Sequence, residues 1–210
     1  GYGSQGIPFK VDVTRFDEVK QMAESVLQRF GRIDILVNNA GAGDQGKLFT
    51  EMELSDWDRV IHLCLYGALH CNRAVVNAMI QQRSGKIISI VSDAGRIGEP
   101  RMTIYSAAKA AIIGHSKALA KELGQYKINV NVISPGSTET ETTMERRERL
   151  ALKDPIGAEK RLKAQLKLYP LGRFGQPGDI AHAVAFLASE KASYITGEVI
   201  SVNGGYAMVS

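Results

Sequence analysis

Apolar residues follow two different spacings along this chain, and the two spacings alternate. Short runs that are almost entirely apolar or β-branched are typical of buried strands, and longer stretches with apolar residues three and four apart are typical of helices. The short runs predict strands at 7–13, 33–37, 86–91, 128–133 and 198–202, and the longer stretches predict helices at 15–30, 55–82, 104–123 and 178–189. Because strands that alternate with helices form parallel βαβ units, the pattern predicts an α/β fold on a parallel sheet.

Local signals refine the ends of these elements. Thr14 lies where a residue that caps the first helix should lie, and Gly31 lies where that helix should end. The run Ile33–Val37 is nearly all apolar, as expected for a strand that is covered on both faces. From 136 to 171 the spacing loosens into charged, weakly amphipathic helix. No repeat or change in composition divides the chain, so we expect one domain over residues 1–210.

Composition narrows the class of protein. The chain has 210 residues, of which 44% are hydrophobic and 23% charged, as a folded domain requires. No apolar run approaches the ~20 residues of a membrane-spanning helix, and no secretory signal is recognisable. We therefore expect a cytoplasmic protein without a membrane partner. Cys64 and Cys71 are too few for a disulfide framework, which favours reduced thiols.

Charge and histidine spacing bear on the partners. The net charge is +4, and much of the basic excess falls between Arg146 and Lys167. A solvated helical face is the simplest interpretation, and a basic flap that meets a phosphorylated or acidic substrate carrier is the alternative. Nucleic acid is not expected, because neither aromatic residues nor a binding motif accompany the charge. No metal is expected either, because no metal-ligand spacing joins the four histidines, His62, His70, His115 and His182.

Ser92, Tyr105 and Lys109 form the pattern with the clearest chemistry. Tyr105 and Lys109 are four residues apart in a predicted helix, so their side chains share a face. Ser92 follows a predicted buried strand, and the loop after it leads into that helix. Ligands of α/β folds bind at the carboxyl ends of parallel strands, so this context indicates an active site rather than a chance surface pair.

These three residue types suit the interconversion of an alcohol and a ketone. Loss of hydride from an alcohol requires removal of the hydroxyl proton, and reduction of the ketone requires its return. An unperturbed tyrosine titrates near pH ~10, and a nearby ammonium such as that of Lys109 lowers such a pKa by about 1–3 units. Ser92 offers a hydroxyl that can hold the substrate oxygen. We therefore predict that Tyr105 is the acid–base group.

Further clusters follow the predicted strands. Asn38-Asn-Ala-Gly41 consists of small residues that let the backbone approach a flat ligand, although it could also be an ordinary polar turn. Pro135-Gly-Ser-Thr-Glu-Thr140 supplies backbone donors and two threonine hydroxyls. Asp12 ends the first predicted strand, where its carboxylate could accept from an adenine amino group or cap the helix.

Taken together, these motifs resemble those of the short-chain dehydrogenase/reductase family, most closely the 3-oxoacyl-carrier-protein reductases and related acyl-CoA and cyclic-alcohol dehydrogenases. The resemblance extends from Ile7 to the C-terminus. It implies a Rossmann-type doubly wound sheet with helices on both faces, NAD or NADP as cofactor, and a homotetramer or homodimer. It rests on Asp12-Val13, Asn38-Asn-Ala-Gly41, Ser92 thirteen residues before Tyr105, Tyr105-x-x-x-Lys109, Pro135-Gly-x-x-x-Thr140, Tyr194-Ile-Thr-Gly-Glu198 and Val202-Asn-Gly-Gly205.

The resemblance also implies a role for each matching residue. Ser92 would orient the substrate, Tyr105 would be the acid and base, and Lys109 would bind the nicotinamide ribose and lower the pKa of the tyrosine. Residues 140–170 correspond to the family's substrate flap. The residues implied to bind the cofactor are Asp12 and Val13 beside the adenine, Asn39, Ala40 and Gly41 on the adenosine side, and Pro135, Gly136, Thr138 and Thr140 at the nicotinamide end, together with Tyr105 and Lys109.

Two features depart from the family pattern. The cofactor fingerprint Thr-Gly-x-x-x-Gly-x-Gly does not occur in these residues and should precede residue 1, so we expect the first βα units to be absent or unresolved. Cys64 stands where the family has an Asn that helps to hold a water of a proton relay. Because a thiol is a weak donor and acceptor, we interpret Cys64 as a core-packing residue.

Three functions are compatible with these residues. The first is an NAD(P)-dependent oxidoreductase that interconverts a secondary alcohol and a ketone, with a 3-oxoacyl thioester on CoA or acyl carrier protein as the candidate substrate. The second keeps this chemistry but acts on a small cyclic alcohol, polyol or sugar. The sequence leaves both substrate classes open, because the loops at 41–51 and 93–103 shape the pocket. The third is a catalytically weak relative that serves binding or assembly, against which the intact set of Ser92, Tyr105 and Lys109 argues.

Overall fold

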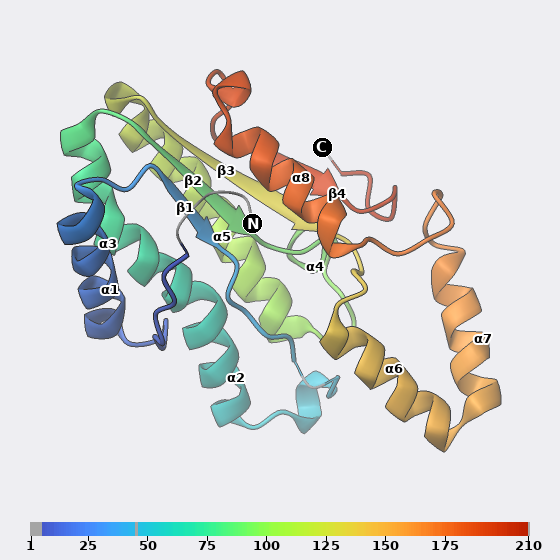
Figure 1. The fold of residues 1–210 in the computed structure, drawn as a ribbon. Coiled ribbons are helices and arrows are strands. Elements are labelled where there is room, and N and C mark those ends of the chain that lie inside the picture. The colour runs from blue at the N-terminus through green and yellow to red at the C-terminus, as the bar shows by residue number, and fades with distance from the viewer. Residues whose placement is uncertain (1–5, 45, 210) are drawn as a thin grey trace.

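The computed structural model describes residues 6–44 and 46–209, in which four parallel strands form one sheet in the order β1-β2-β3-β4 (Figure 1). This arrangement confirms the predicted α/β fold. The strands are β1 (Ile35–Asn38), β2 (Gly85–Ile90), β3 (Ile128–Pro135) and β4 (Val199–Val202). The α-helices are α1 (Phe16–Phe30), α2 (Leu54–Ile61), α3 (Gly67–Gln82), α4 (Ala94–Ile97), α5 (Thr103–Leu123), α6 (Glu141–Lys153), α7 (Pro155–Leu166) and α8 (Pro177–Ala188). Short 3₁₀ turns are η1 (Phe49–Glu51), η3 (Gly124–Tyr126) and η4 (Glu190–Ala192).

Helices cover both faces of the sheet, and neighbouring residues of β2 point to opposite layers. Ile87 shares a core cluster with Met79 of α3, to which α1 and α5 also contribute. Ile88 shares a second cluster with Leu187 of α8 on the other face. All four side chains are almost fully buried, and burial of such a side chain stabilises a fold by about 1.5–3 kcal/mol. The two clusters hold the carboxyl ends of the central strands in place.

Residues 7–13 do not form a strand, contrary to the prediction. The segment is irregular, and within the described part of the chain no strand pairs with it. Thr14 does not cap α1 either, because its amide and hydroxyl donate to the Asp12 carboxylate at 2.9 and 2.8 Å and Arg15 takes the capping position. Gly31 ends α1 as predicted, with a φ of 75° that favours glycine.

The outermost strand is less covered than its apolar sequence predicts. Ile35 and Val37 of β1 remain 46% and 40% exposed, so the expectation of cover on both faces is wrong there. α3 packs against β1 from one side, whereas α8 contacts β2, β3 and β4. Hydrophobic sequence alone does not distinguish an edge strand from a central one, because both present apolar side chains to their neighbours.

The long helix predicted for 55–82 forms, but it has a defect in the middle. α2 and α3 are joined by a π-helical turn, η2 (His62–Tyr66). Such turns insert one extra residue per turn and are frequent at functional sites. Cys64 is the buried residue of this turn.

The loosely patterned segment before α8 forms a helical hairpin that lies away from the sheet (Figure 1). Thr140 caps α6 by accepting from the Thr143 amide, and Asp154 caps α7 by accepting from the Gly157 amide. Pro155 then occupies the first turn of α7, where a missing N–H costs nothing. We call α6 and α7 together the α6–α7 hairpin.

Three further observations concern the described residues as a whole. None of their helices is long and apolar enough to cross a membrane. No three of their His, Cys, Asp or Glu side chains gather in a way that could hold a metal ion. Cys64 and Cys71 are both buried free thiols.

Candidate active site

The carboxyl ends of β1, β2 and β3 open into a cavity of about 660 Å³. Asn39 follows β1, Ser92 follows β2, and Pro135 ends β3, while α5 brings Tyr105 and Lys109 to the same cavity. Parallel strands place their loops at one edge, so residues far apart in sequence meet there. Of the residues proposed from the sequence, those that line this cavity are Asn39, Gly41, Ser92, Tyr105, Lys109, Pro135, Gly136, Thr138 and Thr140.

Ser92 and Lys109 both lie beside Tyr105. A hydrogen bond with the Ser92 hydroxyl acts to lower the pKa of Tyr105, and the Ser92 oxygen also accepts from the Ala94 amide at 3.2 Å. The Lys109 amine lies 5.6 Å from the centroid of the Tyr105 ring. Tyr105 and Lys109 therefore lie close together, as their helical spacing of four predicts, and Ser92 meets Tyr105 from the end of β2.

The Lys109 amine is a buried cation with spare hydrogen-bonding capacity. The residue is 3% exposed, and its Nζ donates to the Ile90 carbonyl at 2.8 Å. Burial disfavours the charged form and lowers the pKa of Lys109. An ammonium carries three donors, so two remain for a polar ligand in the cavity.

The expectation that Lys109 lowers the pKa of Tyr105 is not met. Burial, the Cys64 sulfur and the Asp44 carboxylate raise the pKa of Tyr105 to about 12, against the opposing hydrogen bond from Ser92. The amine lies near the ring face and is bonded to a carbonyl, so loss of hydration has the larger effect on the phenol. Tyr105 is therefore a neutral phenol at neutral pH, which is the proton-donating form.

Cys64 touches the site from the π-helical turn. It is 1% exposed, and its thiol donates to the Ala42 carbonyl at 3.3 Å. A Cβ added to Gly41 would lie 3.2 Å from the Lys109 nitrogen and 3.5 Å from the Cys64 sulfur. The backbone at Gly41 thus runs directly against both side chains, and Cys64 packs in the core while it also lies close to the Lys109 amine.

Next to Ser92 lies a buried carboxylate, that of Asp93, which was not predicted from the sequence. Asp93 is 2% exposed and accepts from the Ser134 hydroxyl and from the Asn203 amide, both at 2.7 Å. Burial raises the pKa of Asp93, and the two hydrogen bonds act against this rise. These contacts tie the ends of β2, β3 and β4 together next to Ser92. The only sequence signal is a charged residue placed directly after an apolar strand.

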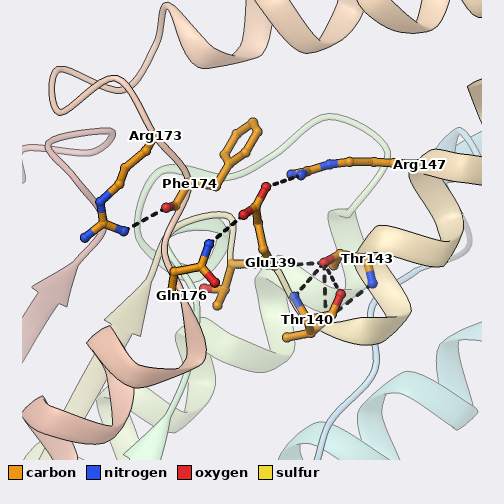
Figure 2. A network of polar contacts seen from close by, with 8 residues as sticks. Glu139, Thr140, Thr143, Arg147, Arg173, Phe174 and Gln176 are labelled. Atoms are coloured by element: carbon orange, nitrogen blue, oxygen red, sulfur yellow. Dashed lines mark hydrogen bonds and ion pairs between the residues drawn. The ribbon is translucent and has the colours of Figure 1, made fainter.

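The base of the α6–α7 hairpin is fixed to the loop before α8 by Glu139 (Figure 2). Its carboxylate accepts from Arg147 at 2.9 Å and from the Gln176 amide at 2.6 Å. The Arg147 guanidinium also stacks 4.1 Å above the centroid of the Phe174 ring. Because Thr138 and Thr140 flank Glu139, this network holds the last wall of the cavity.

The other residues proposed for cofactor binding lie in different places. Ala40 and Val13 line a smaller cavity of about 180 Å³, which Lys109 also borders. Asp12 borders neither cavity, and its carboxylate accepts hydrogen bonds from Thr14, which lower the pKa of Asp12. Sequence reasoning missed the apolar wall that α8 contributes to the larger cavity, formed by Pro177, Ile180, Ala181, Val184 and Ala185.

The larger cavity has the properties that a dinucleotide's nicotinamide end requires. Its volume lies within the roughly 300–1,000 Å³ typical of ligand sites. Its polar lining comes from Lys109 and the other polar residues at the strand ends, and its apolar wall comes from α8. A combination of polar groups and an apolar wall suits a ribose attached to a flat ring.

Comparisons with known proteins agree with this geometry. A family profile described as enoyl-(acyl carrier protein) reductase matches residues 1–207. The chain is 42% identical over 207 residues to a 3-oxoacyl-[acyl-carrier-protein] reductase of Thermotoga maritima, covering 96% of this chain and 79% of that protein. It is also 42% identical to the reductase of that name from Synechocystis, covering 98% of this chain and 78% of that protein.

Two solved structures share the fold. ElxO with NADP bound superposes with a TM-score of 0.85 at 31% identity, covering 94% of this chain and 77% of that one. A variant of ElxO that carries a phenylalanine in place of one tyrosine, with NADPH bound, gives 0.86 at 30% identity, with the same coverage.

Fold and site first define a class, the NAD(P)-dependent oxidoreductases with a Rossmann-type sheet. Within that class, the chain belongs to the short-chain dehydrogenase/reductase family. The predicted family, enzyme class and cofactor type are thereby confirmed.

Proposed function

We propose that this protein reduces a 3-oxoacyl thioester to the 3-hydroxyacyl thioester. The observation that supports this direction is the convergence of Ser92 and Lys109 on a buried, neutral Tyr105. Relatives named as 3-oxoacyl-[acyl-carrier-protein] reductases support the substrate class. Both ElxO structures hold NADP or NADPH, which makes NADPH the first cofactor to test.

Tyr105 acts in this proposal as the proton donor. When the ketone carbon gains hydride, its oxygen becomes an alkoxide, which is far more basic than a phenolate. The Tyr105 phenol then transfers its proton to that oxygen, and the Ser92 hydroxyl donates a hydrogen bond to the same oxygen while charge develops there. A phenol with a pKa of about 12 holds its proton until the alkoxide forms.

The cofactor supplies the hydride when it is bound. Lys109 would hold the ribose hydroxyls with its two remaining donors, and Thr138 and Thr140, which line the cavity, would hold the nicotinamide end. The apolar wall of α8 excludes water from one side of the cavity, which strengthens every hydrogen bond within it. We assign adenosine-side contacts to Asn39, Ala40 and Gly41, with Val13 beside the adenine.

Two larger features complete the proposal. Residues 140–170 act as a flap over the substrate within a single domain that spans residues 1–210. The protein works in the cytoplasm as a homotetramer or homodimer, which light scattering of the full-length protein would test; a monomer at working concentration would contradict this part.

The substrate class is tested with NADPH, the full-length protein, an acetoacetyl thioester and a panel of cyclic ketones. We expect turnover of the thioester by the wild type and loss of it in Tyr105→Phe. Turnover of cyclic ketones alone would replace the thioester by a small ring substrate. A wild-type rate no higher than that of Tyr105→Phe on every substrate would instead indicate a binding or assembly role.

A further inference from the structure

Two arginine side chains from distant segments meet at Gly46, in the loop that follows β1. The guanidinium of Arg101, which lies just before α5, donates to the Gly46 carbonyl at 2.9 Å. A Cβ added to Gly46 would lie 3.2 Å from a guanidinium nitrogen of Arg146 in α6. Gly46 has a φ of 78°, a backbone conformation that favours glycine.

The two arginines are not neutralised by a carboxylate. In the described part of the chain neither forms an ion pair, whereas other basic residues of the α6–α7 hairpin do, such as Arg147 with Glu139 and Arg161 with Asp154. Asp44 is close in sequence, but it is buried and accepts from the Tyr105 amide at 3.3 Å. Like charges that converge without a counter-charge repel each other, and an anion between them removes that cost.

Both arginines are close in sequence to residues that line the active-site cavity. Arg101 precedes Tyr105 by four residues, and Arg146 follows Thr140, which lines the cavity, by six residues. Both side chains are exposed, so they reach a ligand from solvent. Arg149 and Lys153 continue the helical face of Arg146 outward at spacings of three and seven, and both are exposed as well. Exposed positive charge therefore extends along α6 from the contact at Gly46.

We propose that Arg101 and Arg146 bind the phosphate of a phosphopantetheine arm that carries the thioester into the cavity. This inference rests on the proposed reductase function. A guanidinium presents paired N–H donors that match two phosphate oxygens, and two guanidiniums at one residue can hold the phosphate from both sides. A phosphate held by both guanidiniums would join the segment before α5 to α6 beside Gly46, in the loop after β1.

The test compares two thioesters that differ by a single phosphate, acetoacetyl-4′-phosphopantetheine and acetoacetyl-pantetheine. For Arg101→Gln and for Arg146→Gln we expect KM for the phosphorylated substrate to rise about five- to tenfold with kcat unchanged. KM for the pantetheine thioester should not change. Arg73→Gln, which removes an exposed arginine of α3, is the matched control and should leave both substrates unaffected.

Equal effects on the two thioesters, or none, would overturn the phosphate site. Calorimetric titration with free 4′-phosphopantetheine separates this outcome from failure of the reductase proposal, because it requires no turnover. Wild-type protein should bind 4′-phosphopantetheine more tightly than pantetheine, and the Arg101→Gln/Arg146→Gln double variant should bind the two alike. If the wild type makes no distinction, the inference is wrong even where the thioester is reduced.

Discussion

The ends of the central strands and the α6–α7 hairpin border the same cavity, yet they are held in opposite ways. Asp93 and Ser134 at the strand ends and Lys109 of α5 are each 3% exposed or less, and every one of them has a hydrogen-bond partner. In the hairpin no residue of α6 or α7 is buried, and Leu152 and Ile156 are 85% and 83% exposed. The hairpin is attached at its base by Glu139 and its partners (Figure 2).

In our proposal, the buried strand ends carry out the reaction, and the exposed α6–α7 hairpin determines the choice of substrate. The groups that we propose to move a proton are positioned by the same core that folds the protein. The hairpin adds little to that core, and its charged surface can vary at small cost. Variants at the two regions should therefore affect different quantities.

Tyr105→Phe should have the largest effect on rate. It removes the proton donor and leaves the ring in place, so we expect kcat for ketone reduction to fall by about 10²–10⁴-fold. The free energy of unfolding should change by less than about 1 kcal/mol, because one hydroxyl contact is lost. Steady-state assays and denaturant unfolding check the two quantities. A rate loss below tenfold would remove Tyr105 from the mechanism.

Asp93→Ala should have the largest effect on stability. It leaves Ser134 and Asn203 buried without their acceptor, which we expect to cost about 2–4 kcal/mol. For a chain of this size the corresponding fall in Tm is roughly 4–16 °C. Thermal unfolding followed by circular dichroism measures it. An unchanged Tm would mean that the carboxylate does not hold the strand ends together.

Glu139→Ala should affect substrate binding with little change in stability. Loss of the contacts to Arg147 and Gln176 frees the base of the hairpin, and we expect KM for the thioester to rise about threefold to tenfold. Partly exposed ion pairs contribute about 0–1 kcal/mol, so Tm should stay nearly constant. Leu152→Ser at the exposed tip is the control for a general disturbance of the hairpin. Equal KM changes in both variants would contradict a role of the base.

Cys64→Asn should have the smallest effect. The Cys64 sulfur acts to raise the pKa of Tyr105, so its replacement should lower that pKa modestly. Alcohol oxidation, which needs the phenolate, should then be equal or faster at alkaline pH, and ketone reduction at neutral pH should be unchanged. Rates in both directions from pH ~6 to ~10 test this. A large loss of both activities would assign the thiol another task.

Much of this arrangement was predictable from periodic sequence signals. The helices that begin near Leu54 and Thr103 and the strands at Gly85 and Ile128 agree with their apolar spacing, because the core that buries them imposes it. The segment 7–13 has the same apolar character and no partner strand in the described residues, so propensity alone was misleading there. Strand pairing is a tertiary property that a local pattern does not contain.

The site was predictable in its identities and less so in its energetics. The spacing of Ser92, Tyr105 and Lys109 predicts their meeting, but not that burial outweighs the lysine in setting the pKa of Tyr105. The support from Asp93 depends on Asn203, which is 110 residues away, and only the fold brings the two together. The π-helical turn around Cys64 has no local sequence signature that we recognise.

We propose that Tyr105 is a neutral phenol, held so by its buried surroundings, until the substrate oxygen takes its proton. Ultraviolet difference titration of the wild type against Tyr105→Phe reports the ionisation of this one tyrosine among the seven in the chain. We expect no phenolate signal from Tyr105 below pH ~10, where an unperturbed tyrosine is already half ionised. A Tyr105 phenolate that forms near neutral pH in the free enzyme would contradict the account.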